Sequence, residues 1–600
     1  MRVCKHNLVK AMIFIAFTAL YGCGGGTSGN NGATVSKLQE SVTCLGCHTN
    51  AVSPGTGKTI GEEWNFSVHN TKNGAGCADC HEPKAGHPNS CNGCHNGPGV
   101  PLVDEVVRNP DSAGKCDKCH GRGMANELPR SHYYDAKYDA LPTNKTTWNN
   151  MSTVAWVTSK SQRNCNWCHN PHDTTITQQH KDWAESGHGD IKGAAWLNYD
   201  FKARNRATTG ASPATSVATD CIRCHSTTGY INYITSGFRN ISSWADTSGL
   251  DRGKQNLYCN ACHIDGSGRS YGYRMRNVPQ VTGFYNYSVR QPSAKNNLIT
   301  PALKRLLVSF AYPSVGDSNI CMACHVGREN GETLKAIDAQ VSSKLTFAGY
   351  SSYYRNLGFV NSHYLTAGAT VFKASGFEYP GLDYSSNIDR NNNSHYMHDQ
   401  IGRFNTNNTG TSGPCVTCHL KPGRHTLKPL TTDASGNFSS VISPVCANCH
   451  DSANPMTAAI ANTERAALNS ALAALKAMLA QNNIFFKDSN PYFFTSATGN
   501  TGFTRWRKIE TMGAAFNYNL LSHDPGAFAH NRLYVKRLVH DAIDWLYTGS
   551  KLAFGNNGTF MAAGNVEAAI NALPTSASFT AEDKVDAIKY LLGGPGGIRP

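Results

Sequence analysis

One five-residue pattern, Cys-x-x-Cys-His, occurs ten times in this chain of 600 residues. Together the copies use every cysteine of the 22 except Cys4 and Cys23. In residues 77–95 two copies follow one another closely, with His87 between them. Any fold of this chain must therefore place ten pairs of thiols, each with an imidazole directly after the second thiol. The copies begin at Cys44, Cys77, Cys91, Cys116, Cys165, Cys221, Cys259, Cys321, Cys415 and Cys446.

The pattern is the attachment signal of c-type haem. Its two thiols add to the haem vinyl groups, and the histidine takes one axial position of the iron. Zinc ribbons and disulfide frameworks also use paired cysteines, but neither gives a reason for the histidine. Since 24 of the 600 residues are histidine, ten such coincidences have odds on the order of one in 10^14. The sequence predicts ten covalently bound haem c groups.

The predicted attachment residues and proximal ligands follow directly from the ten motifs. The attachment cysteines are Cys44, Cys47, Cys77, Cys80, Cys91, Cys94, Cys116, Cys119, Cys165, Cys168, Cys221, Cys224, Cys259, Cys262, Cys321, Cys324, Cys415, Cys418, Cys446 and Cys449. The proximal iron ligands are His48, His81, His95, His120, His169, His225, His263, His325, His419 and His450.

The sixth position of each iron decides what the haem does. A second histidine gives a closed centre suited to electron transfer, whereas a vacancy lets a small molecule bind and react. Beyond the leader and the motifs the chain has more than enough histidines for ten haems, so bis-histidine ligation is the economical interpretation. His180, His398 and His540 are the spares. The distal candidates are His69, His87, His132, His172, His188, His363, His395, His425, His523 and His530.

The N-terminus reads as an export signal over residues 1–22. A basic start precedes an apolar run at 11–20, which is too short to span a bilayer. The run ends in Leu-Tyr-Gly-Cys, which resembles the lipobox of bacterial lipoproteins and implies a lipid on Cys23. Cleavage without lipidation, leaving a soluble exported protein, is the alternative. Residues 23–40, rich in glycine, are predicted to be a flexible tether.

The composition predicts an unusual fold: irregular coil and short α-helices wrapped around haems, with little β-structure. Hydrophobic residues are only 40% of the chain, so porphyrin must supply much of the apolar core. We expect haems one to seven in residues 41–270 and haems eight to ten in 271–455. Residues 456–600 contain no motif and are predicted to be helical, packing on the haem array and supplying distal histidines; a separate helical domain is the alternative. Residues 344–350 and 370–377 are candidate strands.

The positive net charge is not a nucleic-acid footprint. The formal charge is +14, but ten haems bring about twenty propionates, which make the reduced holoprotein negative overall. The basic side chains are then needed beside propionates, and no nucleic-acid partner is expected.

Several stretches outside the motifs carry a family resemblance. They are CNWCHNPHD (165–173), SGHGD (186–190), CIRCHSTTGYINYI (221–234), NSHYLTAGATVF (361–372) and HDPGAFAHN (523–531). With them the chain resembles the outer-surface multihaem cytochrome lipoproteins of dissimilatory metal-reducing bacteria. The resemblance implies bis-histidine haems, export to the outer membrane and the cell surface, and anaerobic respiration onto extracellular acceptors. It implies a porin-type conduit and other multihaem cytochromes as partners. The distal ligands that it supports best are His172, His188, His363, His523 and His530.

Three functions are compatible with these features. The first is an electron conduit that delivers electrons to metal oxides, electrodes or other cytochromes, and it requires no catalytic residues. The second is a reductase of a small oxyanion, such as nitrite, hydroxylamine or tetrathionate, with one open haem. The Cys-x-x-Cys-Lys motif of lysine-ligated nitrite reductases is absent from the sequence. The third is a conductive filament. The conduit is the leading prediction.

Overall fold

The computed structural model describes residues 37–52, 58–71, 76–81, 172, 177–184, 186–189, 222–239, 257, 259–264, 274–292, 299–342, 354, 357–420, 424–548 and 565–600. The predicted export signal, Cys23, the third to fifth motifs, Cys221, His87 and His132 lie outside these residues. So does the candidate strand 344–350.

The described residues form mainly helices, several of them short. In the first half they are α1 (Lys37–Cys47), α2 (Ile60–Phe66), α3 (Val68–Thr71), α4 (Cys77–His81), α8 (Thr177–Ala184), α10 (Ile222–His225), α11 (Thr227–Thr235) and α12 (Cys259–Cys262). The middle of the chain has η6 (Gly316–Ser318), α13 (Asn319–Met322), α14 (Gly331–Ser342), α16 (Ala367–Val371), η7 (His398–Gln400), η8 (Thr406–Asn408), α17 (Gly413–His419) and η9 (Pro444–Asn448). The C-terminal part has α18 (Ala458–Gln481), α19 (Ile509–Ser522), α20 (Ala527–His530), α21 (Arg532–Thr548), α22 (Asn565–Ala572) and α23 (Ala581–Leu592).

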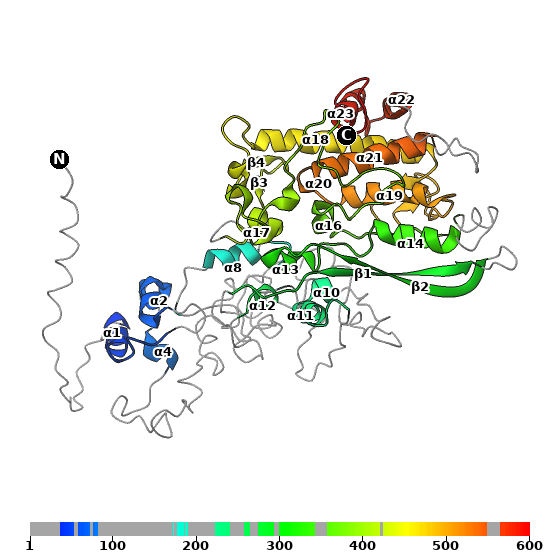
Figure 1. The fold of residues 1–600 in the computed structure, drawn as a ribbon. Coiled ribbons are helices and arrows are strands. Elements are labelled where there is room, and N and C mark those ends of the chain that lie inside the picture. The colour runs from blue at the N-terminus through cyan, green and yellow to red at the C-terminus, as the bar shows by residue number, and fades with distance from the viewer. Residues whose placement is uncertain are drawn as a thin grey trace, which may run out of the picture.

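Strands are few among the described residues, and they pair only as antiparallel hairpins. These are β1 (Thr282–Pro292) with β2 (Ile299–Ala311), β3 (Leu430–Thr432) with β4 (Phe438–Val441), and β5 (Phe485–Phe486) with β6 (Phe493–Phe494). The first hairpin forms a long arm beneath the C-terminal helices (Figure 1). Helix-rich structure with little β is what the composition predicted.

The largest apolar core lies among the C-terminal helices. Helix α18 packs against α23 and α21, and α19 packs against α21 (Figure 1). One face of α18 is buried through Leu468, Leu472, Leu475 and Leu479, as its leucine spacing indicates. Helix α23 begins at a capping box formed by Thr580 and ends at a glycine in the left-handed conformation, which satisfies its terminal backbone groups. These helices share one core with α14, so they pack on the haem-motif region.

Two local predictions were wrong. Residues 370–377 are not a strand, because α16 ends there and its first turn docks on the eighth motif. The backbone N–H groups of Gly368 and Ala369 both donate to the His325 carbonyl, at 2.8 and 3.2 Å. The glycine is required, since a Cβ at position 368 would lie 2.5 Å from the sulfur of Met322. The predicted flexible tether, residues 23–40, also extended too far along the chain, because residues 37–40 belong to α1.

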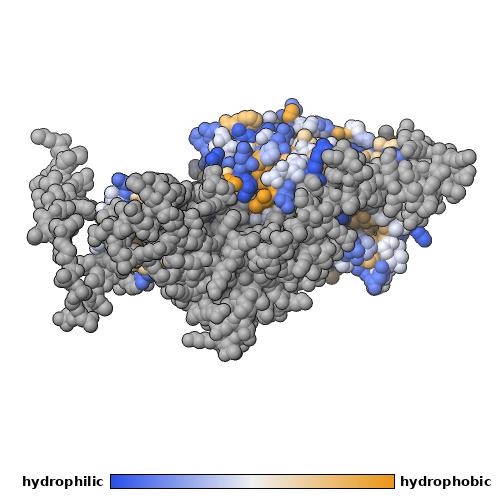
Figure 2. Space-filling model, turned by 90° about the horizontal axis from the view of Figure 1, so that it is seen from below, coloured by the Kyte–Doolittle hydropathy of each residue, from blue (hydrophilic) through white to orange (hydrophobic). Residues whose placement is uncertain are grey.

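The β1–β2 hairpin was not expected from the sequence. Residues 282–287 read TGFYNY, so aromatic residues that favour strands are present but do not alternate strictly with polar ones. No helix among the residues that the structure describes is both long and apolar enough to cross a membrane. Seen from below, the described surface mixes hydrophilic and hydrophobic groups, with a cluster of apolar residues near its centre (Figure 2).

Candidate functional site

Among the residues that the structure describes, five histidines of the motifs each face a histidine that belongs to no motif. The ring planes range from nearly parallel, at 6° for His81 and His172, to nearly perpendicular, at 76° for His188 and His325. The ring-centroid distances are 6.2 Å for His81–His172, 6.3 Å for His188–His325, 6.0 Å for His263–His425, 6.5 Å for His398–His450 and 6.3 Å for His419–His530.

This spacing fits an iron between each pair of rings. Two metal–nitrogen bonds of about 2 Å, with half a ring on either side, separate two axial imidazoles by about 6 Å. Aromatic rings in direct contact have centroids about 4.5–7 Å apart, which includes these distances, so the attachment cysteines beside each pair distinguish ligation from simple ring contact. The five pairs therefore have the dimensions of bis-histidine haem ligation, and each motif histidine stands beside the cysteines that would attach the porphyrin.

The ninth motif also shows how its ligands are oriented. His419 Nδ1 lies 2.9 Å from the Leu427 carbonyl oxygen, and His530 Nδ1 lies 2.8 Å from the Asp524 carboxylate. When each Nδ1 donates its proton there, both Nε2 atoms are left to bind a metal. Such partners fix the tautomer and the ring direction of metal-binding histidines.

Burial favours the neutral form that binds metal for two of these imidazoles. It lowers the pKa of His325 to about 3, with His188 adding to the effect. It also lowers the pKa of His172 to about 4, and the nearby His81 acts in the same direction. These two rings are therefore neutral at neutral pH, whereas for His530 burial is outweighed by the charge and the hydrogen bond of Asp524, which raise its pKa.

The sixth motif has a sixth candidate pair. Burial first, and the charge of His225 second, lower the pKa of His363 to about 4, so the two imidazoles interact electrostatically. His363 adopts a left-handed backbone conformation with φ of 64°, which is uncommon for a residue with a side chain.

Two predicted distal ligands stand elsewhere. His395 lies at the surface with Nε2 2.8 Å from Asp389, whereas His398, a spare in the sequence analysis, faces His450. His523 has Nδ1 2.8 Å from the Asn519 carbonyl oxygen and Nε2 3.0 Å from Asp488. Both of its ring nitrogens therefore have protein partners.

The remaining described candidates are less decisive. His69 stacks on Trp64, with ring centroids 6.5 Å apart, and acts electrostatically on His172. His540 Nδ1 lies 2.8 Å from the Asp541 carboxylate within α21.

The attachment cysteines of four motifs meet in one apolar cluster. It contains Cys324 and, packed against it, Cys224, Cys262, Cys321 and Cys415. Buried aromatic residues of the same cluster include Tyr230 and Tyr233 of α11. Sequence reasoning could not place these motifs together, because about 190 residues separate the sixth motif, which ends at His225, from the ninth, which begins at Cys415.

Paired axial imidazoles beside attachment cysteines define a multihaem c-type cytochrome, and comparison with known proteins agrees. A family model described as outer membrane cytochrome MtrC/MtrF-like, domains II/IV, matches residues 87–274. The chain is 30% identical to the C-type polyheme cytochrome OmcB of Geobacter sulfurreducens, over 86% of this chain and 78% of that protein. It is 32% identical to OmcC of the same organism, over 80% of this chain and 64% of OmcC.

The chain belongs to the family of outer-membrane polyhaem c-type cytochromes that includes OmcB. It is thus an electron-transfer protein of the outer membrane, exposed at the cell surface, as the motif-flanking stretches predicted. No solved structure matches it.

Proposed function

We propose that this chain holds ten haems and passes electrons along them to acceptors outside the cell. The observation that carries the proposal is the set of five histidine pairs with centroids 6.0–6.5 Å apart. A haem iron supplies reversible one-electron chemistry when both axial positions are filled.

The chain's own residues would divide the work as follows. The two cysteines of each motif bind the porphyrin edge covalently, and the motif histidine fixes one face of the iron. The distal histidine closes the other face, which excludes substrate from the metal. We assign one distal histidine to each of six motifs. His172 belongs to the second motif, His363 to the sixth, His425 to the seventh, His188 to the eighth, His530 to the ninth and His398 to the tenth.

This assignment revises the sequence prediction at two positions. His398 replaces His395, because His395 is engaged with Asp389 at the surface. His523 is no longer assigned as a distal ligand, since its ring nitrogens bond to Asn519 and Asp488. The distal ligands of the first, third, fourth and fifth motifs remain to be drawn from His69, His87 and His132, with His180 as a further source.

The export route supports delivery outside the cell. We propose that Cys23 carries lipid, that residues beyond it lead to the body, and that a porin-type conduit with partner cytochromes supplies electrons. Metal oxides or electrodes would receive them. The match to outer membrane cytochromes supports this route.

Electron paramagnetic resonance of the fully oxidised, purified protein tests the proposal, together with haem quantification. Ten haems per chain with every iron low-spin is the expected result. A high-spin ferric signal that shifts on adding nitrite or cyanide would instead mean an open site and a reductase.

A further inference from the structure

Thiols of the eighth motif pack together with thiols of two other motifs. Cys324 and Cys224 of the sixth motif line one small cavity, and Cys321 and Cys415 of the ninth motif belong to the same apolar cluster. Within each pair the thiols also shift each other's pKa. Each of these sulfurs is the atom that bonds the porphyrin, so neighbouring thiols bring two porphyrin edges close together.

The seventh motif lies against the same place. Cys262 acts electrostatically on both Cys321 and Cys324, and all three act on the phenol of the buried Tyr230. The Tyr230 hydroxyl donates to the Ile320 carbonyl oxygen at 2.8 Å, one residue before the eighth motif. Tyr230 thus anchors α11 to the eighth motif at the meeting point.

Among the residues that the structure describes, the tenth motif joins this group through the ninth. Cys446 acts electrostatically on Cys418, and η9 contacts α17. The contacts give a row in the order six, eight, nine, ten, with the seventh motif beside the eighth. The first step of this row, from the sixth motif to the eighth, passes over the seventh motif of the sequence, whereas the other two steps follow the sequence order.

We propose that the eighth motif, residues 321–325, is the junction of the electron path, where routes through the sixth, seventh and ninth motifs meet. The proposal rests on the proposed function, because it assigns an order to the haems which that function requires. Each step at the junction moves one electron: one ferrous iron is oxidised, its ferric neighbour is reduced, and no covalent bond changes.

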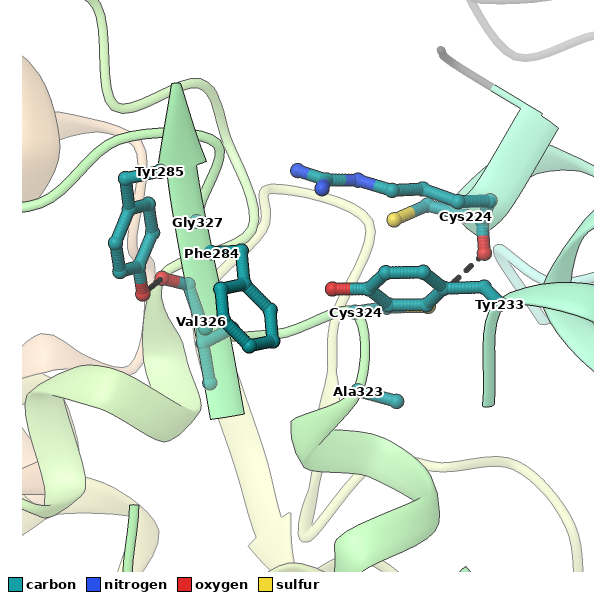
Figure 3. A pocket seen from close by; sticks show the side chains of 10 residues that line it. Cys224, Tyr233, Phe284, Tyr285, Ala323, Cys324, Val326 and Gly327 are labelled. Carbon is teal, nitrogen blue, oxygen red and sulfur yellow. Dashed lines mark hydrogen bonds between the residues drawn. The ribbon is translucent and has the colours of Figure 1, made fainter. Parts of the chain in front are cut away.

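A buried cation stands at the contact between the sixth and eighth motifs. Arg223 is only 9% exposed, and its carbonyl oxygen accepts from Cys324 Sγ at 3.8 Å. Its guanidinium lies over the Tyr233 ring, 5.3 Å from the centroid. Cys224, Tyr233 and Phe284 converge on this spot from α10, α11 and β1, with Cys324 beside them (Figure 3).

Arg223 adds a fixed positive charge where the two porphyrin edges would meet. Such a charge in a region of low dielectric favours the reduced form of a nearby haem. Glu329 also acts electrostatically on Arg223 and partly offsets it. We therefore expect the haems of the sixth and eighth motifs to have higher reduction potentials than the haem of the tenth motif.

The experiment compares two holoproteins that each lose one distal histidine. His188→Ala opens the eighth motif, and His398→Ala opens the tenth, so each should show one high-spin ferric iron by electron paramagnetic resonance. That high-spin centre broadens the signals of its low-spin neighbours. We expect three low-spin signals to lose intensity in His188→Ala and one in His398→Ala.

The outcomes separate the two proposals. If neither variant gains a high-spin iron, the axial assignment under the proposed function is wrong. If both gain one but perturb equal numbers of neighbours, the junction is wrong and the axial assignment stands. Should His188→Ala lack its full haem content, His188→Met replaces it, and the expected sign is three neighbouring transitions displaced in a redox titration.

Arg223→Gln supplies an independent readout. It should move two of the ten redox transitions to lower potential, while Arg223→Lys, which keeps the charge, leaves them near their original values. Arg465→Gln is the matched control, because that arginine lies over Phe438 rather than over Tyr233. Unchanged potentials in Arg223→Gln would remove the residue from the junction.

Discussion

The imidazoles of His81 and His172 lie parallel within 6°, with ring centroids 6.2 Å apart, although one belongs to the second motif and the other follows the fifth. The His188–His325 and His398–His450 pairs have the same spacing but cross at 76° and 75°. The angle between axial imidazole planes sets the splitting of the iron d orbitals. Haems in this chain should therefore differ in spectrum even with identical ligands.

His172→Ala should remove one rhombic low-spin signal and create one high-spin signal, because parallel planes give rhombic spectra and crossed planes give signals with a large principal g value. The measurement is quantitative electron paramagnetic resonance of the oxidised protein at low temperature. An unchanged number of low-spin ferric irons per protein would contradict the pairing with His81.

The two nearby histidines of 395–398 provide a matched comparison. His398→Ala should convert one iron to high spin, since His398 faces His450. His395→Ala should leave all irons low-spin and remove only a surface ion pair with Asp389, which contributes little to stability because water screens it. Spin quantification of both variants decides the assignment, and the reverse result would restore His395 as the ligand.

Asp524→Asn should raise the potential of the haem bound by the ninth motif. The carboxylate accepts from His530 Nδ1 at 2.8 Å and makes the imidazole a stronger donor to ferric iron. Outer partners of this kind change metal affinity about 10–100-fold, and each tenfold change in ferric over ferrous preference is about 59 mV. A spectroelectrochemical titration should show one transition displaced upward by roughly 60–120 mV. A downward displacement would be inconsistent with this role.

Gly413→Ala should destabilise the ninth motif strongly. Gly413 begins α17 with φ of 78°, and a Cβ there would lie 2.1 Å from the Val315 carbonyl oxygen. We expect a loss of about 3 kcal/mol from strain and overpacking. Gly410→Ala is the control, because Gly410 has a similar φ of 76° but no atom within 4 Å, which should cost about 1 kcal/mol. Thermal unfolding followed by Soret circular dichroism measures both, and equal losses would show that the contact with Val315 is unimportant.

Glu329→Gln should flatten the dependence of stability on pH. Burial raises the pKa of Glu329 to about 7 from 4.5, although its hydrogen bond with Thr333 opposes the shift. The folded state therefore binds a proton more tightly than the unfolded state. Its contribution is complete below pH 4.5 and is lost as the pH rises to 7, a change of about 3 kcal/mol. Denaturant unfolding of wild type and variant at pH 5 and pH 8 gives the comparison. Parallel losses in the two proteins would mean that Glu329 is not the group responsible.

The amino-acid sequence determined what this protein is made to hold. Covalent haem attachment needs two thiols and an imidazole within five residues. The Cys-x-x-Cys-His motif therefore identifies this chemistry without any knowledge of the fold. Leucines at helical spacing in α18 and the capping threonine of α23 are local in the same sense. These features depend on the residues next to them, and a reader of the sequence can find them without a fold.

Only the tertiary structure decided which histidine faces which motif. His398 and His395 differ by three residues, and nothing in the sequence distinguishes them, but η7 turns the former toward His450 while Asp389 holds the latter at the surface. The sequence likewise did not predict that four thiols lie together in the fold, those of Cys224, Cys321, Cys324 and Cys415. Distal ligation and haem order depend on contacts between segments far apart in the chain, and such contacts are set by packing across the whole core.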